Sequence, residues 1–208
     1  MSSISTRNER YSQYVPPTID HAKRAQVLDK VVEYLAELGL SELSLRPLAA
    51  ASGTSARMLM HYFGSKEHMI ITALEALRPE IDDQFGAIRD AQTLRDQLYT
   101  GWMANTTGPS ARGTNVVLQV LGDACARRGP FQDYANAAIT TLVDGLSECL
   151  RRLETPVDDP HSAATLLVSG LRGLILDRLI TGDTDRTDRA ALRLINQTIP
   201  VATASDAR

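Results

Sequence analysis

The sequence predicts an all-α protein, with a small three-helix unit at the N-terminus and a larger helical body behind it. Three observations predict this fold class. Apolar residues recur at helical spacing in one segment after another, breaks rich in glycine and proline separate these segments, and no stretch alternates apolar and polar residues between hairpin turns. The chain has 208 residues, 43% of them hydrophobic and 23% charged, which is enough for a sizeable buried core.

The first helix is expected over residues 18–38. Thr18 can cap its N-terminus, and Gly39 can end it. Residues 1–17 are polar and close on two prolines, a pattern typical of a flexible arm. The helix has one apolar face, formed by Val27, Leu28, Val31, Val32, Leu35 and Leu38.

Two short helices are expected next, over residues 45–51 and 55–63. Gly53 lies between them, where a tight turn favours a residue without a Cβ. Ser44 and Ser55 are expected to cap the two helices. The side chains expected to face the core are Leu48, Ala49, Leu59 and Phe63.

This helix pair has the pattern of a helix-turn-helix, whose second helix enters the major groove of DNA with its N-terminal residues at the base edges. The side chains that remain outward on the second helix are Ala56, Arg57, Met60 and His61, with Tyr62 at its end. Short helix pairs with a glycine turn also occur in all-α proteins that never contact DNA. The spacing alone therefore leaves a purely structural role open.

Residues 22–70 resemble the DNA-binding domain of the tetracycline-repressor (TetR) family of bacterial regulators. The turn glycine of the family pattern falls on Gly53, and its closing aromatic, Phe and Lys fall on Tyr62, Phe63 and Lys66. The resemblance implies phosphate contacts from Ser44, Thr54 or Ser55, Tyr62 and Lys66. It implies base contacts from Arg46, Ala56 and Arg57.

Met60 departs from the family pattern, which usually has a tyrosine two residues before the Tyr62 position. A thioether cannot donate a hydrogen bond to a phosphate, although it can pack against a thymine methyl group. We therefore expect this phosphate contact to be lost or taken over by His61. The base preference of relatives does not carry over to this chain.

Behind the helix-turn-helix domain (residues 18–65), residues 66–200 are expected to form the helical body and residues 201–208 a flexible tail. The body begins with a helix at Lys66, which Ser65 can cap. A further segment starts or bends at Pro79. The remaining helices are expected over residues 91–104, 110–128, 131–154, 160–181 and 186–199.

The last two helices carry apolar stripes, and Gly170 and Gly173 allow another helix to approach closely. Such stripes can cover the protomer's own core. Their resemblance to the last two helices of TetR regulators, which form a four-helix dimer interface, implies a homodimer instead. The expected interface residues are Leu167, Leu171, Leu174, Ile175, Ala191, Leu194 and Ile195.

The middle helices carry bulky side chains, and in TetR regulators these helices enclose a small-molecule pocket. The resemblance implies that such side chains line an effector pocket here, although each of them also fits a plain core. The candidates are Phe85, Trp102, Met103, Cys125, Phe131 and Tyr134.

Several classes of function lack their signatures. No glycine-rich phosphate loop, nucleophile motif or metal-ligand spacing is present, so we expect no enzyme, cofactor or metal. Two cysteines without a disulfide or zinc pattern fit a cytoplasmic protein. Residues 165–180 are apolar but interrupted by three charges, which indicates a buried helix face and no membrane span. Net charge is −3, yet residues 1–78 carry nine Lys/Arg against eight Asp/Glu, so the acidity lies in the body.

Taken together, the sequence predicts a homodimeric, ligand-responsive repressor that binds a near-palindromic operator in double-stranded DNA and responds to an unknown small molecule. The alternative is an all-α small-molecule binding protein or enzyme in which the helix pair is only structural. An activator, or a repressor without an effector, also fits the DNA-binding motif.

Overall fold

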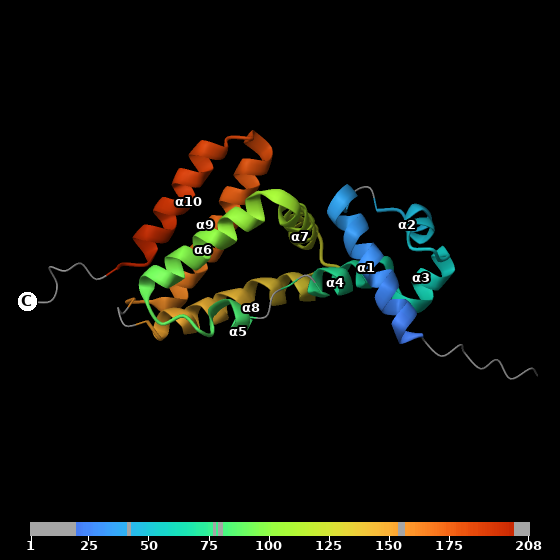
Figure 1. Ribbon diagram of the computed structural model, residues 1–208, viewed down its shortest axis with the longest axis horizontal. Coiled ribbons are helices and arrows are strands. Elements are labelled where there is room, and N and C mark those ends of the chain that lie inside the picture. Colours follow the sequence, from blue (N-terminus) through green and yellow to red (C-terminus); the bar gives the residue numbers. More distant parts are fainter. Residues whose placement is uncertain (1–19, 41–42, 77, 79–80, 154–156, 202–208) are drawn as a thin grey trace, which may run out of the picture.

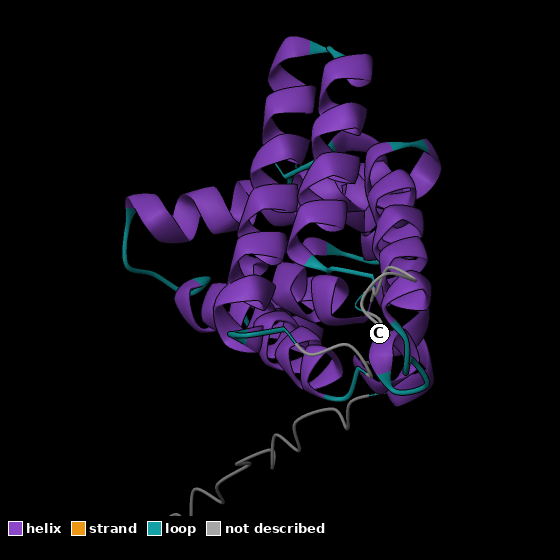
Figure 2. Ribbon diagram, turned by 90° about the vertical axis from the view of Figure 1, so that its left-hand side faces the viewer, coloured by secondary structure: helices purple, strands orange, loops and turns teal. Residues whose placement is uncertain are grey.

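The computed structural model describes residues 20–40, 43–76, 78, 81–153 and 157–201. Over these ranges the chain consists of helices and connecting loops without a strand, which confirms the all-α prediction (Figure 2). The predicted arm (residues 1–17), the Thr18 cap and residues 202–208 of the predicted tail lie outside the described ranges.

The order of the helices follows the prediction closely (Figure 1). A segment was expected to start or bend at Pro79, and the structure has the short helix α5 from Ile81 onward. α10 begins two residues earlier than expected. The helices are α1 (His21–Leu38), α2 (Leu45–Ala51), α3 (Ala56–Phe63), α4 (Lys66–Ala76), α5 (Ile81–Phe85), α6 (Ala91–Thr106), α7 (Gly108–Ala126), α8 (Gln132–Arg151), α9 (Pro160–Thr181) and α10 (Thr184–Thr198).

Aspartate side chains cap several helices. The carboxylate of Asp20 accepts the amide of Lys23 at 3.0 Å, which fixes the start of α1. Asp90, Asp159 and Asp183 do the same for α6, α9 and α10. Each accepts a first-turn amide that has no partner within its helix. At the other end of α1, Gly39 is the C-cap with φ 76°, as predicted.

One hydrophobic core joins the N-terminal helices to part of the body. It contains the predicted apolar face of α1, except for Leu38 at the end of the helix, which is 48% exposed, and the inward residues of α2 and α3. It also contains Met69 and Ile70 of α4, which the sequence assigned to the body, and Val116 and Val120 of α7. α4 therefore shares the core of the helix-turn-helix.

A second core lies between α6, α8, α9 and α10. Gly170 permits a close approach of α9 and α10, because a Cβ there would lie 2.5 Å from Cδ2 of Leu194 on α10. Close packing at Gly170 was expected, and its partner is a helix of the same chain. Gly173 differs, because a Cβ there would meet nothing within 4 Å.

The N-terminal unit is docked onto the body mainly through α1 (Figure 1). α1 packs against α7, and the amide of Leu40 donates to Oε1 of Gln119 on α7 at 3.2 Å. Nε2 of the same glutamine donates to Asn115 at 3.2 Å. Leu40, just beyond the end of α1, is thus held by a helix of the body.

Candidate nucleic-acid interface

The second helix of the predicted motif, α3, is capped at both ends and anchored on one side. Oγ of Ser55 accepts the amide of Met58 at 3.2 Å, as predicted for an N-cap. Gly64 ends the helix with φ 76°. Leu59 and Phe63 are almost completely buried, which confirms them as anchors to the core. The helix is therefore held at its base with its other face free for contacts.

The turn before α3 confirms the requirement for glycine at position 53. Gly53 has φ +60°, in the left-handed region that favours glycine. Its amide donates to the carbonyl of Ala50 at 3.2 Å, and the amide of Thr54 donates to the carbonyl of Ala49 at 2.9 Å. A Cβ at residue 53 would meet nothing within 4 Å, so the backbone conformation selects glycine here rather than a lack of space.

Ser44 is the N-cap residue of α2 by backbone geometry, but its side chain makes no capping hydrogen bond. This corrects the predicted role. An N-cap hydroxyl accepts from the amide two or three residues further on, and the residue three further on is Pro47, which has no amide hydrogen. The hydroxyl of Ser44 is therefore exposed and does not cap its helix.

Two arginines stand out from the α2–α3 surface. Arg46 in the first turn of α2 and Arg57 in the first turn of α3 are both exposed. Within the described ranges neither takes part in an ion pair. Unpaired guanidinium groups on a short helix can bind phosphates or guanine edges.

The remaining predicted DNA contacts differ in exposure. Ser55 is exposed at the N-terminus of α3. The others are half-buried: Thr54, Ala56, Met60, His61 and Tyr62. The rings of His61 and Tyr62 lie 5.9 Å apart between centroids, so the C-terminal part of α3 forms an aromatic surface beside Met60.

Lys66, predicted to contact a phosphate, has an acceptor inside the protein. Its ammonium donates to the main-chain carbonyl of Leu43 at 2.5 Å. Leu43 is buried and precedes α2 by two residues. The bond therefore joins the start of α4 to the entrance of α2.

Arg24 on α1 was not predicted to take part in the site. Its Nε donates to the carbonyl of Tyr62 at 3.3 Å, and its guanidinium lies 5.0 Å from the ring centroid of Phe63. Tyr62 is 38 positions away in the sequence, and no local pattern around residue 24 indicates this contact.

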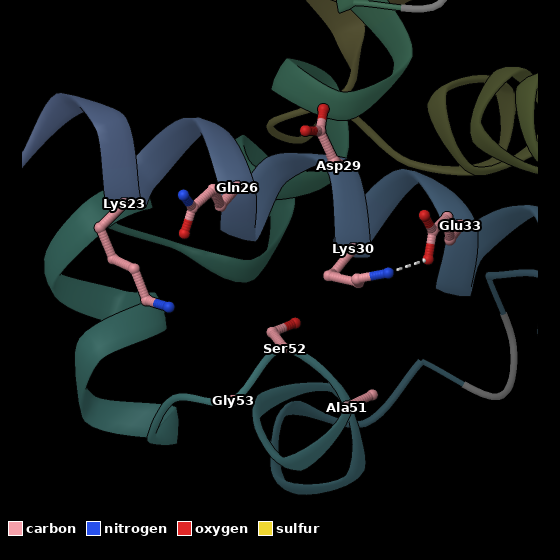
Figure 3. A pocket seen from close by; sticks show the side chains of 8 residues that line it. All are labelled: Lys23, Gln26, Asp29, Lys30, Glu33, Ala51, Ser52 and Gly53. Carbon is pink, nitrogen blue, oxygen red and sulfur yellow. Dashed lines mark hydrogen bonds and ion pairs between the residues drawn. The ribbon is translucent and has the colours of Figure 1, made fainter.

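A groove runs between α1 and the turn that joins α2 to α3 (Figure 3). Lys23 and Lys30 contribute two positive charges, and Asp29 and Glu33 two negative ones. Lys30 and Glu33 form an ion pair at 2.7 Å. Oγ of Ser52 is buried there without a hydrogen-bond partner among the described residues. The balanced charges of this groove do not favour a nucleic acid.

The side chains predicted to line an effector pocket do not come together. Phe131 and Tyr134 belong to the core shared with the N-terminal unit, whereas Phe85 belongs to the second core. Burial raises the pKa of the Tyr134 phenol. Cys125 is exposed, which corrects its placement in a pocket; its position near the end of α7 leaves the side chain outside both cores.

Trp102 and Met103 lie on α6. Trp102 is buried, and its Nε1 donates to Asp188 of α10 at 2.7 Å. Arg178 of α9 donates to the same carboxylate oxygen at 2.5 Å. These two hydrogen bonds to Asp188 connect α6, α9 and α10. Met103 is half-buried.

The predicted dimer residues divide into two groups. Leu167, Ala191 and Ile195 are fully buried within the protomer, Leu167 and Ile195 in its second core, so they cannot form an interface, which corrects that prediction. The remaining predicted residues are half-buried: Leu171, Leu174, Ile175 and Leu194.

A different apolar face of α9 and α10 is solvent-exposed. Its large side chains have between 44% and 75% of their surface exposed. The sequence did not predict those on α9, because apolar residues occur on more than one face of that helix. Gly173 lies on this side of α9 and is exposed. The face, called the α9–α10 face below, consists of Leu166, Leu176, Leu179, Ile180 and Leu192.

Two other classes of site lack support. No group of three or more His, Cys, Asp or Glu side chains within the described ranges is placed to hold a metal ion. Over the same ranges, none of the helices has the length and apolar character needed to cross a bilayer.

Two family models match the chain. One, described as bacterial regulatory proteins of the tetR family, matches residues 27–73. The other, described as a tetracyclin repressor-like C-terminal domain, matches residues 104–201. Together they cover more than half of the sequence. The chain belongs to the TetR family, a class of transcription regulators rather than enzymes.

Individual relatives agree with this family. The transcriptional repressor KstR2 of Rhodococcus jostii RHA1 is 37% identical over 79 residues, which are 36% of this chain and 37% of that protein. The chain matches only 37% to 40% of the length of the first two curated relatives.

Solved structures share the fold over most of the chain. A transcriptional regulator from Rhodococcus sp. RHA1 superimposes with a TM-score of 0.67 at 21% identity, covering 84% of this chain and 95% of that one. The complex of SmeT, a repressor from Stenotrophomonas maltophilia, with triclosan gives 0.66 at 18% identity, covering 85% and 90%.

Proposed function

We propose that the chain is a homodimeric, ligand-responsive transcriptional repressor that acts in the cytoplasm on a near-palindromic operator. The observation that carries this proposal is α3. This helix is capped by Ser55, is anchored by Leu59 and Phe63, and carries the exposed Arg57 in its first turn. A helix of this kind places its N-terminal residues at base edges in the major groove.

Arg57 is the side chain that we expect to read a base. Replacing Arg57 with Ala should weaken operator binding by about 1–3 kcal/mol and relax selectivity at one base position. Binding of the parent and of Arg57→Ala to a set of single-base operator variants measures both effects. Unchanged selectivity at every position would remove Arg57 from the base-reading role.

The α9–α10 face supports dimerisation. Five large apolar side chains lie exposed on two adjacent helices, and exposed patches of this kind mark interaction surfaces. Gly173 lets a second helix approach closely, because no atom lies within 4 Å of its Cβ position. Two linked recognition helices also bind much more tightly than one. The proposed occupant of this face is therefore a second copy of the chain.

Leu176→Asp tests the interface, because the new charge would be buried against the partner. Sedimentation should find the parent dimeric and the variant monomeric at the same concentration. Ile139→Asp is the matched control: Ile139 is 38% exposed on α8, a helix that contributes no residue to the α9–α10 face, and its variant should stay dimeric. A dimeric Leu176→Asp protein would rule out this face.

The proposed effector is a small molecule that binds the body. The complex of the related SmeT with triclosan supports this part of the proposal. An effector that prefers the conformation with lower DNA affinity shifts the population away from the operator. The contact between Gln119 on α7 and Leu40 before α2 is a direct connection between body and DNA-binding unit.

A panel of small molecules, screened by thermal shift, identifies binders, because a ligand stabilises the folded protein according to its concentration over Kd. Each binder is then added to the operator complex. An effector should raise the melting temperature and release the DNA. Binders that stabilise the protein while leaving operator affinity unchanged would contradict ligand control.

A further inference from the structure

Two cationic side chains of the DNA-binding unit are directed inward, unlike Arg46 and Arg57. Lys66 donates to the carbonyl of Leu43, and Arg24 donates to the carbonyl of Tyr62. We propose that Lys66 and Arg24 are positioning residues for operator binding, which fix α3 relative to α2 and α1 through these two carbonyls, and that Lys66 does not act as a phosphate-contacting cation. This inference rests on the proposed DNA binding.

The bond from Lys66 closes the helix-turn-helix on itself. Leu43 stands just before α2 and Lys66 just after α3, so one hydrogen bond joins the two ends of the motif across 23 positions. The Leu43 side chain is 3% exposed and held in the core, which fixes the position of its carbonyl. An ammonium–carbonyl bond is charge-assisted and stronger than a neutral one. The geometry of α2 relative to α3 therefore depends on Lys66.

Arg24 acts at the C-terminal end of α3. The carbonyl of Tyr62 belongs to the last turn of the helix, where carbonyls lack intrahelical amide partners. A positive charge there also interacts favourably with the helix dipole. The guanidinium stacks 5.0 Å from the Phe63 ring centroid, which adds a cation–π contact. α1 thus holds the end of the recognition helix.

The two possible roles of Lys66 predict different salt dependence. A lysine that neutralises a phosphate releases a counterion, so its loss lowers the slope of log affinity against log salt by about 0.9. A lysine that bonds to a carbonyl of its own protein releases none. Its loss weakens binding by the same factor at every salt concentration.

The experiment measures operator affinity of the full chain across a series of KCl concentrations. Lys66→Met removes the donor and should weaken binding about tenfold, the effect of losing one charge-assisted hydrogen bond, with the parent's salt slope. Lys66→Gln keeps an N–H donor without the charge and should restore most of this loss. Lys30→Met is the control, because Lys30 is paired with Glu33 on α1 and its variant loses the same charge; its affinity should match the parent's.

The outcomes separate the possibilities. A slope lowered by about 0.9 in both Lys66 variants, with equal loss of affinity, would establish a phosphate contact and overturn the proposal. Parent-like binding by Lys66→Met would also overturn it. Arg24→Met should also weaken operator binding with the parent's salt slope, and Arg24→Lys should restore part of the lost affinity. A lowered salt slope in Arg24→Met would contradict the positioning role of Arg24. If the parent itself selected no duplex, the proposed DNA binding would fail instead.

Discussion

Gly53 offers a test of why the helix-turn-helix has a glycine turn. Gly53→Ala adds one methyl group to a residue with φ +60°, and that methyl would meet nothing within 4 Å. Crowding therefore contributes nothing, and the cost is that of holding an L-residue in the left-handed region, about 1–2 kcal/mol.

Gly122→Ala is the matched control. Gly122 lies within α7, is exposed, and its Cβ position likewise has no neighbour within 4 Å. In a right-handed helix the same methyl group should stabilise the protein by about 1 kcal/mol. The two variants should therefore differ in unfolding free energy by roughly 2–3 kcal/mol, with opposite signs relative to the parent.

Urea unfolding followed by circular dichroism measures this difference through the shift in midpoint at a common slope. We expect Gly53→Ala to unfold at lower urea than the parent and Gly122→Ala at higher urea. If Gly53→Ala were as stable as the parent, backbone conformation would not be the reason for glycine at this turn.

Two further predictions concern the body. Asp188→Ala leaves the buried Trp102 indole and the Arg178 guanidinium without their shared acceptor; urea unfolding should show a loss of about 1–3 kcal/mol, and parent-like stability would show that the link does not matter. The Ser162 hydroxyl and amide hold the pKa of Asp159 below its usual value. The resulting stability is present above the ordinary aspartate pKa and is lost as pH falls through the lowered folded-state pKa. Asp159→Asn keeps an oxygen acceptor without titrating, so between about pH 5 and pH 3 its unfolding midpoint should fall less than the parent's. Equal declines would exclude Asp159 as a source of acid sensitivity.

Local patterns predicted the helix-turn-helix well, because its determinants are close in sequence. The Ser55 cap, the Gly53 turn and the buried Leu59 and Phe63 all depend on spacings of a few residues. The exception was Ser44. Its side chain makes no capping hydrogen bond, and one of the two amides that it could accept is missing, because Pro47 has no amide hydrogen.

Long-range contacts account for most of what the sequence did not predict. Nothing near Lys66 indicates a bond to Leu43, and nothing near Arg24 indicates one to Tyr62. In α9, apolar residues occur on more than one face, so periodicity could not tell Leu167, which is fully buried, from Leu166, which is 55% exposed. Only the packing of α8 and α10 against α9 distinguishes the two faces.

The most direct test of the central proposal is selection from random DNA. The full-length protein is incubated with a pool of random duplexes at about 0.15 M salt, and bound sequences are recovered over several rounds. We expect enrichment of two half-sites related by twofold symmetry, with centres about one helical turn apart or a multiple of it. A recovered pool as random as the starting one would contradict sequence-selective DNA binding by this protein.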